Sequence, residues 1–518
     1  MSEISIIPTG IGDGRLSRIQ WNALLAHSLI KSSRYIIQLN PNDGYYEAID
    51  GLNGTIAYGG ANNIGSANGS NATQVLQAAL SGLTSGRTFK EKITIKGNLI
   101  VTGATAVNIY NYTILEGGLL TGNITLQVVG SHISLKDITT TMDNTVFAAF
   151  YIQPLNTTLT DIEFINCIAL NCGCTGFYNN GNGTPCTISN LRYINCQAIN
   201  CGLNSQYNPW VVGFDLAEWN GMTIKDVSLI GCYASASWES GFHIEDTPTK
   251  INVNFIGCIS ENNGQKTNPT FGAGFLVSNG VSLYNCKSKN NYKGFMIDNV
   301  NSSNDTITIN DCEDTNSVTD GCDGTGNNGH VFINGLTLNN SGKFGVQFVS
   351  GGNWHVKNLR IINPTGNING LCTEFGSTGG AGLTNSEFEI YFEGGMQSTC
   401  IWTGGSNNLR FTGVINTTQA TPFYNNGGTN IFAHFNQNMG FSLNTPNVPS
   451  SGNNITNTFP YTVNIYISTA TNASYIITDP LGNMSNSMVL TAGQEISLDY
   501  GAKITVTYST LTWNWYGT

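Results

Sequence analysis

The chain has 518 residues, of which only 10% are charged, and its formal net charge is −11 at pH 7. About 25% is usual for a globular protein, and without a Lys/Arg-rich run an electrostatic nucleic-acid surface is excluded. No apolar run approaches the roughly 20 residues of a membrane span, whereas frequent Val, Ile, Thr and aromatic residues are typical of a β-rich fold with many turns.

Residues 1–75 are predicted to form an N-terminal attachment and cap region. The chain starts without the basic segment and apolar core of a secretion signal, which predicts a cytoplasmic origin. Residues 15–31 carry apolar side chains at near-helical spacing, and residues 33–60 resemble a set of hairpins. Residues 71–80 predict a helix with Asn71 as its cap, which would cover the open end of a strand stack.

Residues 76–442 contain a repeat that predicts a right-handed parallel β-helix. Short runs of alternating apolar and polar residues end in a cysteine every 26 to 36 residues. One coil can bury its inner face only against neighbours about 4.8 Å away, so equivalent residues should form columns. A two-sheet sandwich would show hairpin signals and no fixed period. The repeated cysteines are Cys167, Cys196, Cys232, Cys258, Cys286 and Cys312.

A Gly–aromatic step follows each of the first five of these cysteines. Cys, Val, Ile and Phe suit the inward columns, whereas Asn suits the corners because it tolerates a left-handed backbone and forms amide ladders. The 13 cysteines show no zinc-ligand spacing. We interpret them as buried inert thiols, with a redox role as the alternative, since no basic neighbour would activate them. The steps are Gly176-Phe177, Gly213-Phe214, Gly241-Phe242, Gly274-Phe275 and Gly294-Phe295.

The C-terminal part differs from the repeats. Residues 443–458 are rich in Pro, Ser and Asn, which is typical of a linker. Several strand-like runs follow. They predict a small C-terminal β-sandwich over residues 459–518.

The helix at 72–80, the alternating strand at 93–101 and the start of the coils at Asn111-Tyr-Thr-Ile-Leu-Glu-Gly117 together resemble pectin-lyase-like β-helix proteins, including phage tailspikes. The segments at 35–37, 45–51 and 54–58 resemble a lead-in of archaeal and archaeal-virus β-helix proteins. The resemblance implies a homotrimeric spike on the virion surface. Such a spike would bind a host-surface glycan and would contact other virion proteins through its N-terminal region. It implies no cofactor and no metal.

The enzyme motifs of these families are missing from the chain. Polygalacturonases have Asp-Asp and Arg-x-Lys, and neither occurs here, while the Gly-His-Gly element is reduced to Gly329-His330. With only seven Arg in the chain, the Arg base of a pectate lyase is also doubtful. A glycoside hydrolase needs only two carboxylates at a suitable distance and therefore stays open.

Alignment on the Gly–aromatic step predicts a glycan groove between residues 210 and 300. Asp215 and His243 fall in one column, and carboxylates in adjacent coils would be about 5 Å apart. Tryptophan faces suit sugar rings. The alternative is that the acids are solvated surface residues and that the tryptophans serve only for packing. The candidate catalytic residues are Glu218, Asp246, Glu245 and Asp215, and the candidate carbohydrate-binding residues are Trp210, Trp219, Trp238, His243 and Asp298.

Three functions remain open from the sequence. The first is a viral receptor-binding spike, the second a polysaccharide-degrading enzyme on the same fold, and the third a structural surface or turret protein. An extracellular or cell-surface location is the alternative to the virion. An assay for depolymerisation of host polysaccharide would separate the enzyme from the other two functions. Solution mass would separate a trimer from a monomer, and detection of the chain in purified virions would separate a spike from a cellular protein.

Overall fold

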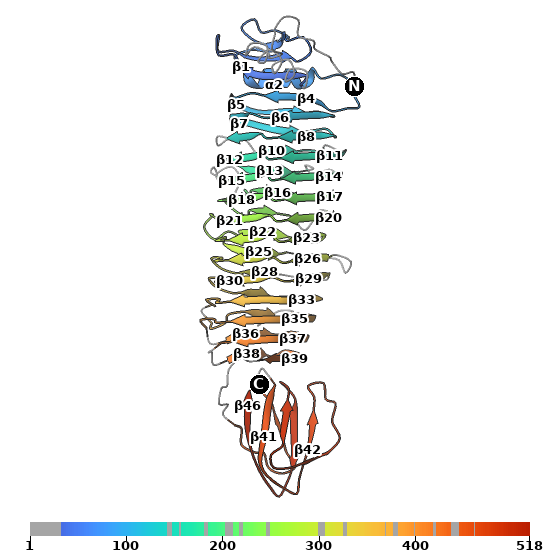
Figure 1. Cartoon of the computed structure of the whole chain (residues 1–518), viewed down its shortest axis with the longest axis vertical. Coiled ribbons are helices and arrows are strands. Elements are labelled where there is room, and N and C mark those ends of the chain that lie inside the picture. The colour runs from blue at the N-terminus through green and yellow to red at the C-terminus, as the bar shows by residue number, and fades with distance from the viewer. Residues whose placement is uncertain are drawn as a thin grey trace, which may run out of the picture.

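Parallel strands stack into a long rod, and a small antiparallel domain follows at its C-terminal end (Figure 1). The computed structural model describes residues 33–517, except 142–147, 155–156, 181–184, 203–210, 217–220, 245–248, 299–305, 325–328, 368, 377–381, 398, 418–420, 437–444 and 460–461. The helix expected at 15–31 lies outside the described residues. None of the described helices is long and apolar enough to cross a membrane.

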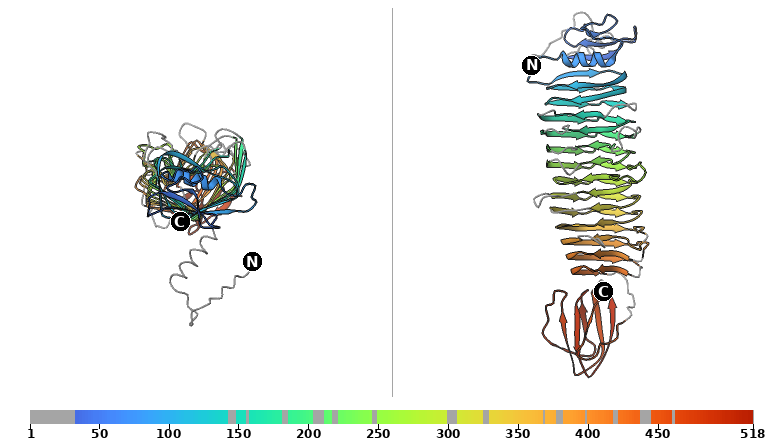
Figure 2. Two further views of the ribbon diagram at one scale, coloured as in Figure 1. Left: turned by 90° about the horizontal axis from the view of Figure 1, so that it is seen from above. Right: turned by 180° about the vertical axis from the view of Figure 1, so that it is seen from behind.

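The N-terminal end of the rod is covered by a short antiparallel sheet and one helix. Strands β1 (Tyr35–Leu39), β2 (Tyr46–Asp50) and β3 (Ile56–Gly59) pair in sequence, and β1 also pairs in parallel with the first coil. Helix α2 (Ala72–Ser81) lies against this end (Figure 2), and the Asn71 side chain accepts from the backbone amides of Thr73 and Gln74. The predicted hairpins and the Asn-capped helix are confirmed.

Each coil contributes strands to three faces of the rod. Face 1 comprises β4 (Glu91–Ile95), β6 (Thr113–Glu116), β8 (Ile133–Lys136), β11 (Thr158–Ile165), β14 (Cys186–Ile194), β17 (Met222–Ile230), β20 (Thr249–Ile256), β23 (Val281–Tyr284), β26 (Thr306–Asn310), β29 (His330–Asn334), β32 (Gly351–Gly352), β33 (Trp354–Ile362), β35 (Leu383–Glu393), β37 (Asn407–Asn416) and β39 (Thr429–Asn436).

Face 2 is made of short strands, and face 3 begins with two long ones. Face 2 comprises β9 (Thr139–Thr141), β12 (Ile168–Leu170), β15 (Gln197–Ile199), β18 (Tyr233–Ser235), β21 (Ile259–Glu261), β24 (Lys287–Lys289), β27 (Glu313–Thr315) and β30 (Thr337–Asn339). Face 3 comprises β5 (Asn98–Ile109), β7 (Leu119–Val128), β10 (Ala148–Ile152), β13 (Thr175–Asn179), β16 (Phe214–Asp215), β19 (Phe242–His243), β22 (Ala273–Val277), β25 (Lys293–Ile297), β28 (Cys322–Gly324), β31 (Val346–Phe348), β34 (Glu374–Gly376), β36 (Thr399–Gly404) and β38 (Thr421–Asn426).

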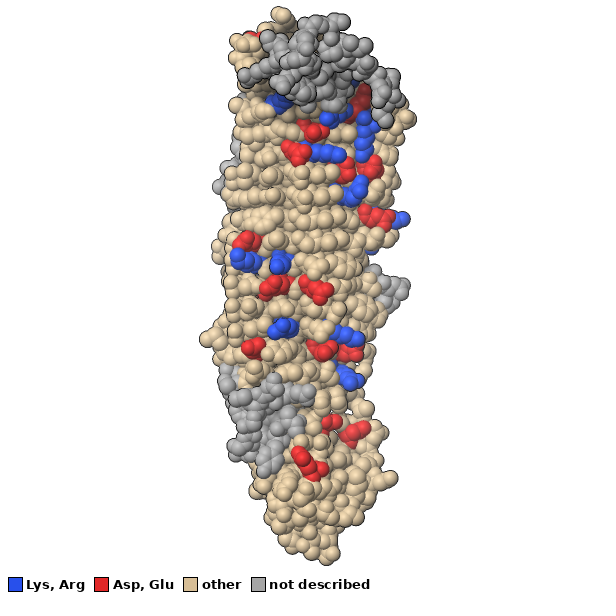
Figure 3. Space-filling view, in the orientation of Figure 1, with Lys and Arg blue, Asp and Glu red and all other residues tan. Residues whose placement is uncertain are grey.

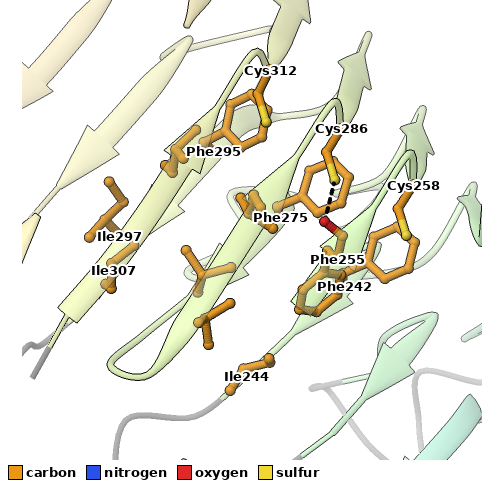
Figure 4. Packing of buried hydrophobic residues seen from close by; sticks show 14 of the residues in the cluster. Phe242, Ile244, Phe255, Cys258, Phe275, Cys286, Phe295, Ile297, Ile307 and Cys312 are labelled. Atoms are coloured by element: carbon orange, nitrogen blue, oxygen red, sulfur yellow. Dashed lines mark hydrogen bonds between the residues drawn. The ribbon is translucent and has the colours of Figure 1, made fainter. Parts of the chain in front are cut away.

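The coils form a right-handed parallel β-helix, as predicted. Equivalent residues pair directly, as Phe164 does with Tyr193 and Tyr193 with Leu229. The inner Phe rings stack from coil to coil, as Phe242, Phe275 and Phe295 do in Figure 4. The Phe242 ring is centred 4.9 Å from both Phe214 and Phe275. This continuous apolar interior holds the rod together, because no single coil could bury its own inner face.

The cysteines line the interior as buried thiols. All 13 are buried and free of disulfides. The Cys232 thiol donates to the carbonyl of Tyr193 in the preceding coil, and Cys258 donates to Leu229. Burial raises the pKa of Cys232 far above its usual range, so this thiol stays protonated and unreactive at neutral pH.

The Gly of each Gly–aromatic step is required by the close approach of the next coil. A Cβ on Gly213 would lie 2.6 Å from the carbonyl oxygen of Gly241, and one on Gly294 would lie 2.3 Å from that of Gly321. No side chain fits into such a gap, because the obstacle is backbone. The step therefore marks a close contact between consecutive coils.

Asparagines occupy the corners, as the sequence predicts. Asn166 and Asn195 adopt φ values of 53° and 52° between faces 1 and 2. Between faces 2 and 3, the Asn200 amide donates to Asn171 Oδ1 at 2.9 Å. Left-handed backbone is tolerated by Asn, and the amide ladder satisfies the side chains between coils.

The C-terminal domain is a β-sandwich, as predicted. One sheet has the order β40 (Asn454–Thr456), β45 (Lys503–Thr507), β42 (Ala473–Thr478) and β43 (Met488–Leu490). The other has the order β44 (Glu495–Leu498), β41 (Val463–Thr471) and β46 (Thr510–Gly517). His434 at the end of the rod contacts Asp499 of this domain at 3.2 Å. The division into 1–75, 76–442 and 459–518 stays a prediction.

Candidate functional site

One outward column on face 3 collects most of the polar and aromatic residues that could hold a ligand. In each coil, the residue that follows the Gly step points inward, and the next residue points outward. The strand registers join these outward residues in one line. From the N-terminal to the C-terminal end, the column is Tyr151, Tyr178, Asp215, His243, Leu276, Met296, Asp323, Gln347, Glu374, Trp402 and Tyr424.

Two of the predicted site residues are direct neighbours in this column. Asp215 pairs with His243 in the strand register, as the alignment predicted. Both side chains are buried, each with 5% exposure. Glu239, which precedes the Gly step at 241, is also buried and binds Lys266 at 2.7 Å and the amide of Phe271. The carboxylate of Glu239 thereby fixes the segment at 266–271 and is not free for a ligand.

The other predicted site residues are placed only in part. Trp238 packs against the hydrophobic core and is partly buried, which agrees with the packing alternative. Asp298 is half-exposed at the end of β25, where its amide donates to the carbonyl of Val277. A glycan groove here stays a prediction. The remaining candidates lie outside the described residues: Trp210, Glu218, Trp219, Glu245 and Asp246.

A cavity of about 660 Å³ lies farther along face 3 (the face-3 cavity). It opens beside the outward residues of β31 and β34 and is bordered on one side by the turn that precedes β34. Asn367 shapes this turn, because its Oδ1 accepts from the amides of Asn369 and Leu371 at 2.9 and 3.0 Å. The lining residues are Gly342, Lys343, Phe344, Gln347, Gly366, Asn367, Asn369, Leu371 and Glu374.

Three side chains give this cavity its chemistry. Gln347 Nε2 donates to Glu374 Oε2 at 2.8 Å, so the carboxylate is oriented and keeps further acceptor capacity. Lys343 Nζ lies 4.6 Å from the centroid of the Phe344 ring. Within the described part of the chain, Lys343 makes no ion pair. An acceptor, an amide and a cation therefore converge on one concave surface.

Two aspartates lie in the coil that precedes Gln347. Asp323 precedes Gln347 in the column and pairs with Lys293. Asp320 is buried, with 2% exposure. Burial and, second, the charge of Asp323 raise the pKa of Asp320 to about 6, although Lys293 and Lys343 oppose this shift.

Aromatic residues continue the column beyond Glu374. Trp402 pairs with Glu374 in the register but has only 3% exposure, whereas Tyr424 in the next coil is 48% exposed. Tyr424 therefore offers an accessible ring face two coils from Glu374, about 10 Å along the rod axis. The cavity and this ring lie on one line parallel to the axis.

The sequence contained a signal for this site that the alignment did not use. Asp323 and Gln347 follow Gly321-Cys322 and Gly345-Val346, as Asp215 and His243 follow their Gly-Phe steps. Neither of these later steps contains an aromatic residue, so an alignment on Gly–aromatic steps does not include them. The cavity itself also depends on the turn at 364–372, whose conformation has no repeat signal.

Structures of other β-helix proteins resemble this chain at low identity. A double mutant of the tailspike protein of E. coli bacteriophage HK620 matches with a TM-score of 0.46 and 10% identity, over 95% of this chain and 98% of that chain. The Azotobacter vinelandii mannuronan C-5 epimerase AlgE6 A-module matches with 0.41 and 12%, over 70% and 95%. A catalytic domain of a GH87 alpha-1,3-glucanase matches with 0.41 and 11%, over 70% and 67%.

Neither protein-family models nor curated proteins match the chain. At the identities and TM-scores of the structural matches, the likeness carries no argument about function. The functional conclusion therefore rests on the residues of face 3.

Proposed function

We propose that this protein binds a carbohydrate chain along face 3, with the face-3 cavity as the main recognition site. The observation that carries the proposal is the cavity of about 660 Å³ in which Glu374, Gln347 and Lys343 converge. Carboxylate and amide groups pair with sugar hydroxyls, and exposed aromatic rings pack against the apolar faces of sugars. The axial line from Asp323 to Tyr424 suits an extended chain better than a compact ligand.

Replacing Glu374 by Gln is expected to weaken glycan binding by about ten- to a hundredfold, because a hydrogen bond to a charged group contributes about 1.5–3 kcal/mol. The measurement is calorimetric titration of the full chain with oligosaccharides prepared from candidate host surfaces. Glu495→Gln, an exposed carboxylate change on the C-terminal sandwich, is the matched control and should leave binding unchanged. Equal affinities for wild type and Glu374→Gln would refute the assignment of the cavity.

A glycoside hydrolase is the second candidate function, and Asp320 favours it. A buried carboxyl whose pKa is raised to about 6 can hold a proton near neutral pH, as a general acid must. Glu374 of the face-3 cavity would be the second carboxylate that such a reaction needs. Release of reducing ends from a bound polysaccharide would establish hydrolysis. If the polysaccharide stayed intact after long incubation, the protein would bind it without cleaving it.

We propose further that the chain is the receptor-binding spike of a virion and associates as a homotrimer. An exposed apolar stripe at the edge of faces 1 and 2 supports lateral association with further copies. Ile230 and Ile256 are consecutive outward residues there, with 38% and 41% exposure, and Ile259 lies around the corner.

Figure 3 shows charged side chains in groups, with surface free of Lys, Arg, Asp and Glu between them. In the strand register, Ile259 has Lys287 as its neighbour in the next coil. Copies in parallel would place apolar residues against apolar residues at the same height along the rod. Measuring the solution mass of the full chain tests whether it forms a trimer. Detecting the chain in purified virions tests whether it is a virion spike. A monomer outside virions would favour the structural surface protein.

A further inference from the structure

A second outward column, on face 1, contains a different set of chemical groups. Strand registers join Phe332 in β29, His355 in β33, Glu387 in β35, Arg410 in β37 and Phe432 in β39, one residue per coil. Aromatic rings therefore stand at both ends of a line of titratable side chains. Face 1 carries this column on a different side of the rod from the face-3 cavity.

The N-terminal end of this column is a cluster of three stacked rings. The planes of His330 and His355 lie within 14° of the Phe332 plane, and Phe332 is 42% exposed. His330 Nδ1 and His355 Nε2 are 3.3 Å apart, and His355 Nδ1 lies 3.4 Å from Glu387. These contacts hold the rings in a stack on the strand surface. The exposed Phe332 ring of this stack suits the apolar face of a sugar ring.

The C-terminal end of the column opens into a cavity of about 280 Å³ (the face-1 cavity). Lys357 and Arg410 line it together with Glu387 and Glu389. Within the described chain, neither Lys357 nor Arg410 makes an ion pair, and Arg410 lies 5.5 Å from the centroid of the Phe432 ring. That cation–π contact orients the guanidinium while leaving its N–H donors for an anion.

We propose that this column is a second glycan-binding site, specific for an acidic oligosaccharide. One sugar ring packs against the exposed Phe332 ring of this stack, and a carboxylate or sulfate farther along the same chain binds Lys357 and Arg410. Glu387 and Glu389 accept hydrogen bonds from sugar hydroxyls. Three coil steps separate Phe332 from Arg410, about 14 Å along the axis, so the ligand is an oligosaccharide rather than a single sugar.

The two glycan sites lie on different faces, so this site goes beyond the proposed function and is separable from it. Unpaired cations distinguish the face-1 cavity from a neutral sugar site, because an arginine that is already stacked loses little freedom on binding a bidentate anion. Salt should weaken the interaction, since the contacting charges are exposed.

The experiment titrates the full chain with three oligosaccharides of equal length: an oligogalacturonate, a sulfated heparin fragment and neutral maltohexaose. Wild type is expected to bind at least one acidic probe and not the neutral one. Arg410→Gln combined with Lys357→Gln is expected to weaken that binding about tenfold or more. Phe332→Ala should weaken it severalfold. Glu495→Gln, on the C-terminal sandwich, should leave it unchanged.

Three results would overturn the proposal. They are equal binding of the neutral probe, no binding of either acidic probe at low salt, and unchanged binding after the double Lys357/Arg410 change. Thermal melting of each variant checks that the fold is retained, as expected for exposed side chains. If Glu374→Gln alone abolishes binding of the acidic probe, the ligand belongs to the face-3 cavity instead.

Discussion

Replacing Phe242 by Ala is expected to lower the free energy of unfolding by about 3–5 kcal/mol, the usual cost of removing a buried phenylalanine side chain. Phe242 has no exposed surface and stacks between Phe214 and Phe275. Its loss leaves a gap in a column that spans several coils, and the neighbouring rings cannot close it because their own strands fix them. Chemical unfolding followed by tryptophan fluorescence measures the change.

The control for this experiment is Phe89→Ala. Phe89 is 61% exposed near the N-terminal end of the rod, so its removal should change the unfolding free energy by less than about 1 kcal/mol. If both variants shifted the unfolding transition equally, the inner phenylalanine column could not be the element that joins the coils. A larger loss in Phe242→Ala supports the coil-to-coil packing on which both proposed sites depend.

The second large effect concerns Asp314, a carboxyl inside the rod. It has no exposed surface and accepts hydrogen bonds from Ser317 Oγ at 2.7 and 2.8 Å. Burial raises the pKa of Asp314 from 3.8 to about 7, although hydrogen bonds from Ser288 and Ser317 oppose this shift. The folded chain therefore keeps this proton over a pH range in which the unfolded chain releases it.

The sign of the pH dependence follows from this difference. The stabilising contribution of Asp314 is complete below pH 3.8 and is lost as pH rises to about 7. This loss amounts to about 4 kcal/mol at 1.36 kcal/mol per pKa unit. Asp314→Asn is therefore expected to melt at a higher temperature than wild type at pH 8 and at a similar temperature near pH 4. Melting curves at these two pH values check the prediction.

Asp311→Asn is the matched control, because Asp311 is an exposed aspartate at a corner of the same coil. It should not alter the difference in melting temperature between pH 4 and pH 8. If Asp314→Asn melted below wild type at pH 8, the carboxylate would have to be stabilised in the rod by partners other than Ser288 and Ser317.

The fold could be predicted from the sequence by itself, because each coil of a β-helix repeats the same short pattern of inward, outward and corner residues. Cys196, Cys232 and Cys258 recur at the end of matching strands, and the structure stacks them as inward thiols. The corner asparagines and the Asn71 cap were equally predictable, since each depends on backbone conformation within a few residues. The column that joins Asp215 to His243 followed from the same alignment.

Only the tertiary structure decided which outward residues are accessible. Asp215 and His243 share a column with Gln347 and Glu374, yet the first pair is buried and the second pair lines a cavity. Exposure depends on how the segments between strands lie over a face, and these segments carry no repeat. The unpaired state of Arg410 likewise depends on neighbours from other coils. Periodic packing is thus encoded locally, whereas a binding surface arises from contacts between parts of the chain that follow no common pattern.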